Sequence, residues 1–486
     1  MSPDIFVIGG GPAGATAARL LADWGWSVQL AHRQIERPSL AESLPASTRK
    51  LLAFLCQLET IDGAAFHPNQ GNVACWGGER RETPTAEAGY HVSRARFDAL
   101  LRQSARSAGV SILDAVVRDV DLGDEPRVGY QASGASGPCE VRPRMVLDCS
   151  GRAGIVARRG FRRTDVSYRT LALAAEWEST GWPPAESART VVESFPGGWA
   201  WSVPLSSTRR QCTVMIDPHT VNALRAGAPR DGALQHVYTR ALHATDALRV
   251  RLETARQTSR PWGTHASLYH SPTPCDRGVL LVGDAASFIE PLSSAGVKKA
   301  ITSGWRAAVV ANTCLSNPAM TSHALAFYAE REREIYAQCR ELARQYFAKA
   351  AAAHRTPFWT TRARDLSRAD SGAENRGIHA AHERLRGGAR VRLRPSAALR
   401  FLPAPDIEGR EVVLRDAIVP PGSDTPLRFA AGVNLPALVR LVAGCDDVPA
   451  IFSAYHAHVG PAPLDSLITG LSLLVARHAL ILEDAR

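Results

Sequence analysis

The chain has 486 residues, of which 45% are hydrophobic and 21% are charged, and this composition excludes a wholly disordered protein. Its formal net charge is +10, but the basic residues form no cluster interleaved with aromatic residues, so the charge does not predict nucleic-acid binding. No apolar run approaches the roughly 18 residues that a membrane-spanning helix requires.

The cysteines and the N-terminus indicate where the protein works. The nine cysteines are dispersed and include no C-x-x-C pair, which favours reduced thiols over a disulfide framework or a zinc site. The first residues lead directly into an apolar run, without the basic region or cleavage site of a secretory signal. We therefore expect a soluble, cytoplasmic protein with no membrane segment and no bound metal.

The first thirty residues predict a strand, a glycine-rich turn, a helix and a second strand. Residues 5–8 are apolar, residues 15–24 have the small residues of a closely packed helix, and residues 28–30 (Val-Gln-Leu) predict the next strand. This β–α–β order is typical of a parallel, doubly wound sheet.

The turn contains the motif Gly9-x-Gly11-x-x-Gly14. In such a motif the first glycine permits a tight turn, the second lets the backbone approach a pyrophosphate, and the third lets the helix pack closely. The first helical residues, including Pro12 and Ala13, would offer free N–H groups to the phosphates. A glycine-rich turn without a ligand is the alternative.

The acidic residue that usually follows the second strand and binds the adenosine ribose is missing. His32 and Arg33 stand there, and Glu36 lies a little further on. This departure does not fit the simplest NAD-binding pattern, although it leaves the predicted pyrophosphate site intact.

The rest of the chain divides by its pattern of apolar residues. Strand-like segments separated by Gly, Pro and Ser turns predict an inserted, mainly β domain over residues 161–275, and a buried strand at residues 279–282 is followed by Gly283 and Asp284. A helix to about residue 314 and a long charged helix at residues 321–353 come next. The expected domains are 1–160 with 276–353, the insert 161–275, a linker at 354–394 and a small α/β, winged-helix-like module at 395–486.

Four motifs in this order resemble those of FAD-dependent aromatic hydroxylases of the p-hydroxybenzoate hydroxylase type. Besides the glycine motif and Gly283-Asp284, they are a segment around Arg94, whose counterpart contacts the flavin, and residues 148–152, which resemble an Asp-x-Ser-Gly-Arg segment. The resemblance covers about residues 3–350. It implies an α/β protein with a Rossmann-like, glutathione-reductase-type FAD-binding domain, an inserted β-rich substrate domain and a small α/β C-terminal domain.

The resemblance also implies which residues bind FAD. They come from the glycine motif, the second strand, the Arg94 segment and the loop after Asp284. The expected cofactor-binding residues are Gly9, Gly11, Pro12, Ala13, Gly14, His32, Arg33, Ser43, Arg94, Val117, Gly283, Asp284, Pro291, Ala295, Gly296 and Val297.

Within this superfamily the sequence is similar to the flavin-dependent halogenases. Trp199-x-Trp201-x-Val203-Pro204 resembles their W-x-W-x-I-P signature, residues 288–296 resemble their flavin loop, and residues 41–45 resemble a loop beside the isoalloxazine. The alternative for both tryptophans is that they fill space and shield the flavin from water.

Two side chains typical of the halogenases are absent. Asn69 or Gln70 stands where the resemblance places the lysine that receives hypohalous acid, and Ser293 stands where tryptophan halogenases have a glutamate. We therefore expect a monooxygenase that transfers oxygen from a flavin C4a-hydroperoxide, formed with O₂, to an aromatic ring. The expected catalytic residues are Glu290 and Lys298, and the expected substrate-pocket residues are His67, Asn69, Trp199 and Trp201.

No second nucleotide motif is visible, so we expect reducing equivalents from a partner flavin reductase or diffusible reduced flavin, with NAD(P)H as the alternative source. Halogenase-like enzymes without the lysine include those that hydroxylate a tryptophan in a partner polypeptide during tryptophylquinone cofactor biogenesis. The expected substrate is thus tryptophan or another indole, free or within a peptide or protein, and the basic charge would suit an acidic partner. The alternatives are a halogenase of tryptophan, phenol or pyrrole, and a flavin oxidoreductase that inserts no oxygen.

Overall fold

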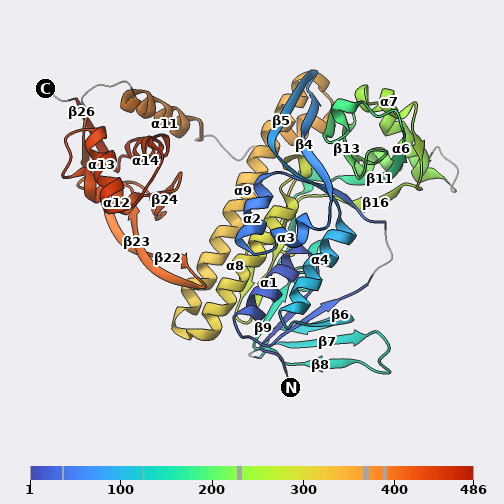
Figure 1. Ribbon diagram of the computed structural model, residues 1–486, viewed down its shortest axis with the longest axis horizontal. Coiled ribbons are helices and arrows are strands. Elements are labelled where there is room, and N and C mark those ends of the chain that lie inside the picture. Colours follow the sequence, from blue (N-terminus) through green and yellow to red (C-terminus); the bar gives the residue numbers. More distant parts are fainter. Residues whose placement is uncertain are drawn as a thin grey trace. The chain divides into compact units, whose positions relative to one another are not determined.

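The computed structural model describes residues 2–34, 38–123, 125–226, 232–364, 371–386 and 391–484. Glu36, the acidic residue a little beyond the second predicted strand, lies outside the described residues. The chain divides into two compact units, Met1–Asp365 and Leu366–Arg486, which Figure 1 shows in blue to orange and in brown to red.

The first unit is built on an eight-stranded sheet whose centre is parallel. Its order is β18-β19-β9-β1-β2-β6-β7-β8. Every residue of β1 and β9 is buried, as expected for central strands covered on both faces. The strands are β1 (Ile5–Ile8), β2 (Val28–His32), β6 (Ser111–Asp121), β7 (Arg127–Ala132), β8 (Cys139–Val141), β9 (Met145–Asp148), β18 (Cys275–Asp276) and β19 (Val279–Leu281).

Helices α1 (Pro12–Asp23) and α8 (Gly296–Ser316) lie side by side next to this sheet (Figure 1). Two glycines let their backbones approach. A Cβ atom on Gly14 would collide with the carbonyl of Gly9, and one on Gly304 would collide with the carbonyl of Ala13. The predicted β–α–β start and doubly wound sheet are therefore confirmed, together with the close helix packing expected of Gly14.

A nine-stranded sheet forms the second layer of this unit. It has the order β15-β11-β14-β13-β12-β4-β5-β3, and β16 pairs with β11. Its strands are β3 (Ala41–Leu44), β4 (His67–Trp76), β5 (Glu79–Ser93), β11 (Leu171–Glu178), β12 (Thr190–Phe195), β13 (Gly198–Pro204), β14 (Arg209–Ile216), β15 (Arg256–Gln257) and β16 (Trp262–His265). A three-stranded sheet joins β10 (Arg163–Thr164), β17 (Tyr269–His270) and β20 (Ser287–Phe288).

This sheet extends beyond the insert predicted at residues 161–275. Strand β4 pairs in parallel with β12, so residues before the insert complete its sheet. Three short helices also occur within the insert: α5 (Pro218–Ala226), α6 (Ala233–His243) and α7 (Ala247–Leu252). Pairing between strands more than a hundred residues apart leaves no local pattern, which is why the sequence did not show it.

Shorter helices complete the N-terminal half of the unit, namely α2 (Ser47–Phe54), α3 (Leu58–Asp62) and α4 (Arg94–Ser107). Two further helices follow α8. Helix α9 (Thr321–His354) agrees with the long charged helix predicted at 321–353, and α10 (Pro357–Ala363) follows it. Together α9 and α10 cover a cluster of buried aromatic side chains that includes Trp76, Trp199 and Trp359.

The predicted linker at 354–394 contains regular structure. Besides α10 it holds α11 (Ser371–Arg386), whose Ala381 and Leu385 are buried. Leu385 belongs to the hydrophobic core of the second unit. The Arg, Gly and Ser content of this stretch conceals an amphipathic helix, because few apolar positions are enough to anchor it.

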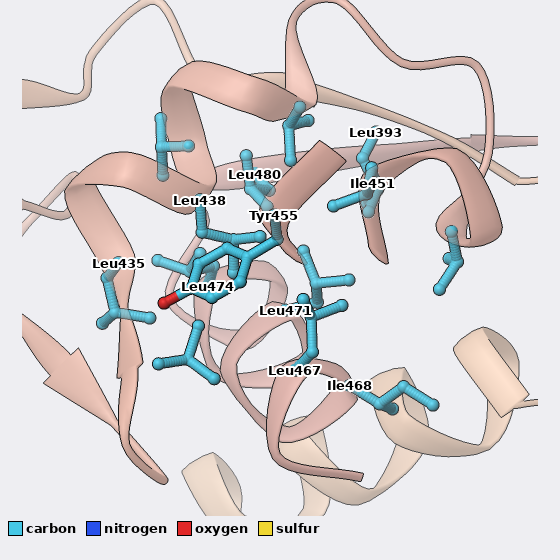
Figure 2. Close-up of a cluster of buried hydrophobic side chains, with 14 of the residues drawn as sticks. Leu393, Leu435, Leu438, Ile451, Tyr455, Leu467, Ile468, Leu471, Leu474 and Leu480 are labelled. Carbon is cyan, nitrogen blue, oxygen red and sulfur yellow. The ribbon is translucent and has the colours of Figure 1, made fainter. Parts of the chain in front are cut away.

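The second unit has its own hydrophobic core, shown in Figure 2. Leu435, Leu438, Leu471 and Leu474 surround the ring of Tyr455, whose hydroxyl accepts a hydrogen bond from the Asn434 backbone N–H at 2.7 Å. The helices are α12 (Leu435–Val442), α13 (Val448–His458) and α14 (Leu464–Ala476). The strand pairs are β21 (Val391–Pro395) with β26 (Leu480–Asp484), β22 (Arg400–Glu408) with β23 (Glu411–Val419), and β24 (Phe429–Ala430) with β25 (Val433–Asn434).

None of the helices that the structure describes combines the length and the apolar character needed to cross a bilayer.

A buried ion pair joins α8 to α9 and gives a test of their packing. The Arg306 guanidinium donates to Glu332 at 2.8 Å, and the two side chains are 9% and 2% exposed. Replacing Arg306 with leucine leaves a buried carboxylate unpaired, so we expect a loss of about 3–5 kcal/mol in the free energy of unfolding. Urea denaturation followed by circular dichroism measures this loss.

The double variant Arg306→Leu with Glu332→Leu is the control. We expect it to be more stable than the single variant, because no unpaired charge remains. If the double variant loses as much stability as the single variant or more, the ion pair does not have the assigned role.

Candidate functional site

A cavity of about 540 Å³ opens at the carboxyl ends of β1, β2, β9 and β19 in the first unit. This is the edge at which doubly wound sheets bind ligands, and the volume lies in the usual range for small-molecule sites. The predicted residues that line it are Gly9, Gly11, Pro12, Ala13, His32, Arg33, Arg94, Val117, Asp284, Pro291, Gly296 and Val297.

The glycine turn at the cavity wall fits a pyrophosphate. Gly9 has φ +105°, and a Cβ there would lie 2.5 Å from the carbonyl oxygen of Cys149. Beside Gly11, in contrast, the nearest atom to a Cβ would be an Asp98 oxygen at 3.9 Å, which leaves room for a phosphate to reach the backbone. Helix α1 begins directly after Gly11 and has no acidic residue in its first turn. The donor set is therefore that of a dinucleotide site.

Arg94 is held in the cavity by two carboxylates. Its guanidinium donates twice to Asp98 on the next turn of α4, at 3.0 Å each, and lies 3.4 Å from Glu42 on β3. Glu42 also lines the cavity, and burial raises the pKa of its carboxyl while Arg94 partly offsets the rise. The bidentate contact with Asp98 fixes the orientation of Arg94. The sequence analysis identified Arg94 but not Glu42 or Asp98.

Asp284 lies in the short turn Gly283–Ala285, and the neighbouring lysine supports that turn. The Lys299 ammonium is buried, donates to the carbonyls of Gly283 (3.0 Å) and Ser287, and lies 3.8 Å from the Asp284 carboxylate. Lys299 therefore positions the loop that carries Asp284. Lys298, the lysine predicted to be catalytic, instead donates to Ser47 at 3.2 Å and does not line the cavity.

Four predicted cofactor-binding residues are not among those that line the cavity, namely Gly14, Ser43, Gly283 and Ala295. Gly14 contributes through helix packing, as described above. The hydroxyl of Ser43 accepts hydrogen bonds from Asn69 and Thr190, each at 2.9 Å, so it joins β3 to β4 and β12. Ala295 precedes the first residue of α8.

Glu290 stands at the edge of the aromatic cluster. Its side chain is 5% exposed, and its Oε1 atom has no hydrogen-bond partner among the described residues. Burial raises the pKa of Glu290 to about 7, although Arg362 and Trp199 lower it. A carboxyl group with this pKa exchanges a proton readily near neutral pH, which is the property expected of a general acid or base.

The two predicted tryptophans belong to the same cluster. The rings of Trp199 and Trp201 stack at 4.8 Å, and Trp199 meets Trp76 edge-on at 6.2 Å. Trp76 in turn packs against Trp359 at 5.4 Å. Trp199 is 2% exposed, and neither Trp199 nor Trp201 lines the cavity. Their packing agrees with the alternative that they exclude water.

The remaining predicted pocket residues make contacts within the second sheet. The Asn69 amide donates to Ser43 (2.9 Å) and to the Leu44 carbonyl (3.1 Å), and its oxygen accepts from the Gly71 N–H (3.0 Å). His67 Nε2 lies 2.7 Å from the Ser187 carbonyl. The structure thus brings Asn69 and His67 together on β4, away from the cavity lining. The Asn69 side chain stabilises the bulge at Gly71.

The four lysines do not supply an amine to this cavity. Lys298 and Lys299 have the partners given above, Lys349 donates to Glu79 at 2.7 Å on the surface, and Lys50 is exposed on α2. None of the four is among the residues that line the cavity.

Comparisons with known sequences relate the chain to halogenases. It is 28% identical to a tryptophan 2-halogenase of Chondromyces crocatus over 77% of this chain and 73% of the relative. It is 25% identical to a 1H-pyrrole-2-carbonyl-[peptidyl-carrier protein] chlorinase of Pseudomonas fluorescens over 62% of this chain and 73% of the relative.

Solved structures share the α/β fold. The flavin-dependent halogenase CmlS matches with a TM-score of 0.82 and 20% identity over 100% of this chain and 96% of that chain. The peptidyl tryptophan dihydroxylase QhpG, essential for tryptophylquinone cofactor biogenesis, matches with a TM-score of 0.69 and 22% identity over 98% and 99%. A sequence profile of the tryptophan halogenase family matches residues 57–390, and the chain therefore belongs to that family of flavin-dependent enzymes.

Proposed function

We propose that the protein is a flavin-dependent halogenase that acts on an electron-rich aromatic ring, with FAD in the cavity beside the glycine turn. The family match over residues 57–390 carries the proposal. The names of two relatives, a tryptophan 2-halogenase and a 1H-pyrrole-2-carbonyl-[peptidyl-carrier protein] chlorinase, support the reaction class. The turn at Gly9 and Gly11, the fixed guanidinium of Arg94 and the Asp284 loop fit the cofactor.

Bound and reduced FAD supplies the chemistry that activates O₂ to an oxidant. The protein must bind the ring, exclude water and handle the proton that the ring loses. The cluster around Trp76, Trp199 and Trp359 provides an apolar region from which water is excluded.

Glu290 is the residue that we assign to the ring proton. In electrophilic aromatic substitution a new bond forms at a ring carbon, and the C–H bond at that carbon then breaks and releases a proton. Glu290 is buried against the aromatic cluster, has an unpartnered oxygen and has a pKa of about 7. Its carboxylate form accepts this proton, and its solvent-shielded position strengthens the interaction with the developing positive charge.

Hydroxylation of the ring is the second candidate. It is favoured by the position of Asn69, where the resemblance places the halogenases' lysine, because all hydrogen-bonding groups of that amide have partners within the protein. The match to the peptidyl tryptophan dihydroxylase over nearly the whole of both chains agrees with it. In this reaction oxygen, and not halogen, becomes bonded to the ring, and Glu290 accepts the same proton. Tryptophan within a partner polypeptide stays a predicted substrate.

Intact mass separates the two candidates. Purified enzyme is incubated with reduced FAD, ¹⁸O₂ and bromide, and with a panel of free indoles, phenols, pyrroles and tryptophan-containing peptides. For the halogenase we expect a product with the bromine isotope doublet that forms only when bromide is present. A bromide-independent gain of ¹⁸O contradicts the halogenase proposal and establishes the hydroxylase. Oxidised product with neither bromine nor ¹⁸O contradicts both.

The variant Glu290→Gln tests the assigned proton acceptor. Because the carboxylate is the active form and the pKa is about 7, the wild-type rate should rise as pH increases through 7. The variant should lose this rise and should be slower by about 100-fold or more at pH 8. Single-turnover product formation between pH 5.5 and 8.5 measures both effects.

Glu341→Gln is the matched control, because Glu341 is exposed on α9 and pairs with Arg344. We expect it to keep the wild-type rate and pH profile. If Glu290→Gln keeps bound FAD and shows the same pH-dependent rise as the wild type, Glu290 does not accept the proton.

The source of electrons is a separate prediction. We expect the pure protein to oxidise NADH or NADPH far more slowly than it turns over substrate, and we expect added flavin reductase with free FAD to restore turnover. Absorbance at 340 nm, recorded beside product formation, checks this expectation. Stoichiometric NAD(P)H oxidation by the protein alone at the rate of product formation would overturn it.

A further inference from the structure

A second cavity of about 620 Å³ lies in the first unit, next to the cofactor cavity. Ala153 lines both cavities, and the guanidinium of Arg152 lies over the ring of Phe288, which lines the first, at 5.4 Å. Three arginines line the second cavity, namely Arg152, Arg158 and Arg162. Nothing in the proposed reaction accounts for this concentration of positive charge.

The three guanidinium groups have no acidic partner. No aspartate or glutamate lines the second cavity, and none of the ion pairs found in the described part of the chain includes these arginines. Their hydrogen bonds go to backbone carbonyls: Arg152 donates to His265 at 2.8 Å, and Arg162 donates to Arg152 at 2.9 Å. Arg152 and Arg158 therefore keep guanidinium donors that these bonds do not use.

Arg162 is fixed in this arrangement without a carboxylate in direct contact. Its guanidinium stacks on the ring of Tyr269 at 3.8 Å, and its Nε and Nη2 atoms are buried and have no hydrogen-bond partner in the described structure. Tyr269 is held in turn, because its hydroxyl donates to the Asp284 carbonyl at 2.7 Å. Burial lowers the pKa of Arg162 and the charges of Asp148 and Asp284 only partly offset this, so a bound anion would stabilise the charged guanidinium.

We propose that this cavity binds the phosphate group of an organic phosphate. Three guanidiniums and the nearby hydroxyls of Thr164 and Ser267 offer more donors than the two oxygens of a carboxylate can accept, whereas a phosphate has three oxygens and about two negative charges. The cavity is much larger than a bare phosphate ion, so an organic remainder shares it. The site is distinct from the glycine turn that fits the FAD pyrophosphate.

Such a phosphate belongs to one of two sources. NADPH carries a terminal phosphate on its ribose, and its binding here would supply the reductant next to the cofactor cavity in place of the partner reductase expected above. Free phosphopantetheine also carries a terminal phosphate and would bring a substrate as its thioester, whereas on a carrier protein the same phosphate is a diester with only two free oxygens and one charge. The shared chemistry is the phosphate ester, and the two sources differ in what occupies the remainder of the cavity.

The test measures binding to the full-length protein already loaded with FAD, so that the cofactor's own phosphates do not contribute. Isothermal titration is run with inorganic pyrophosphate, NADPH, phosphopantetheine and, as the dephosphorylated control, pantetheine. We expect saturable binding of pyrophosphate and of one of the two organic phosphates, and none of pantetheine. Binding of NADPH identifies the nucleotide source, and binding of phosphopantetheine identifies the thioester source.

Arg158→Gln is the test variant, because Arg158 is exposed and its neutralisation leaves the stacked Arg162 in place. We expect its dissociation constant for the phosphate ligand to rise about tenfold, the loss of one charge-assisted hydrogen bond. Arg81→Gln, which neutralises an exposed arginine on β5, is the matched control and should bind as the wild type does.

Three results would overturn the proposal: no saturable binding of any phosphate, equal weakening by Arg158→Gln and Arg81→Gln, or loss of FAD from Arg158→Gln. The first excludes the site, the second assigns the binding to general surface charge, and the third assigns Arg158 to the cofactor site. None of these results depends on whether the enzyme halogenates or hydroxylates its substrate.

Discussion

The first unit depends on close approach between backbone segments at the N-terminus of α1. Gly14 lets that helix lie against the turn that follows β1, and Gly304 lets α8 lie against the carbonyl of Ala13. Any side chain at either position would push the elements apart. Because α1 forms one wall of the cofactor cavity and α8 carries Gly296 and Val297 on another, these contacts set the width of the cavity. Packing at Gly14 and Gly304 therefore determines how far apart the residues on the two walls of the cavity lie.

The charged residues in and near the cofactor cavity differ in whether they have partners. Arg94 is neutralised and oriented by Asp98 and Glu42, and Lys299 is satisfied by carbonyls beneath the Asp284 loop. Glu290 is buried with one oxygen unpartnered. Groups held by hydrogen bonds and ion pairs can position a ligand, whereas a group with a pKa near neutrality can exchange a proton. Within the first unit, Arg94 and Lys299 thus serve to position groups, and Glu290 is the residue suited to transfer a proton.

The sequence predicted the features that local pattern determines. The glycine motif, the Gly283-Asp284 turn, Arg94 and the long helix α9 all lie where the residues indicated. It selected Lys298, whereas Lys299 is the buried lysine, since adjacent residues on a helix point in different directions and only the packing of α8 decides which is buried.

Pairing between distant segments could not be read from the sequence. Glu42 acts on Arg94 only because β3 pairs with β5, immediately before α4, whereas Asp98 lies one turn along α4 from Arg94. Asn69 has the position that the resemblance assigns to the halogenases' lysine, but its side chain joins β4 to β3, a role that depends on the sheet. Helix α11 escaped detection because its polar composition outweighed the few residues that anchor it to the second core.

The separate hydrophobic core around Tyr455 has a consequence for how this protein can diverge. All residues that line the cofactor cavity precede position 301, and the family profile ends at residue 390, after α11 but before the other strands and helices of that core. A substitution within the second core must be compatible with the other residues of that core. It does not have to preserve the geometry of the flavin site. The C-terminal unit can therefore accumulate changes at its own rate, so that relatives with the same oxidative chemistry can acquire different C-terminal surfaces.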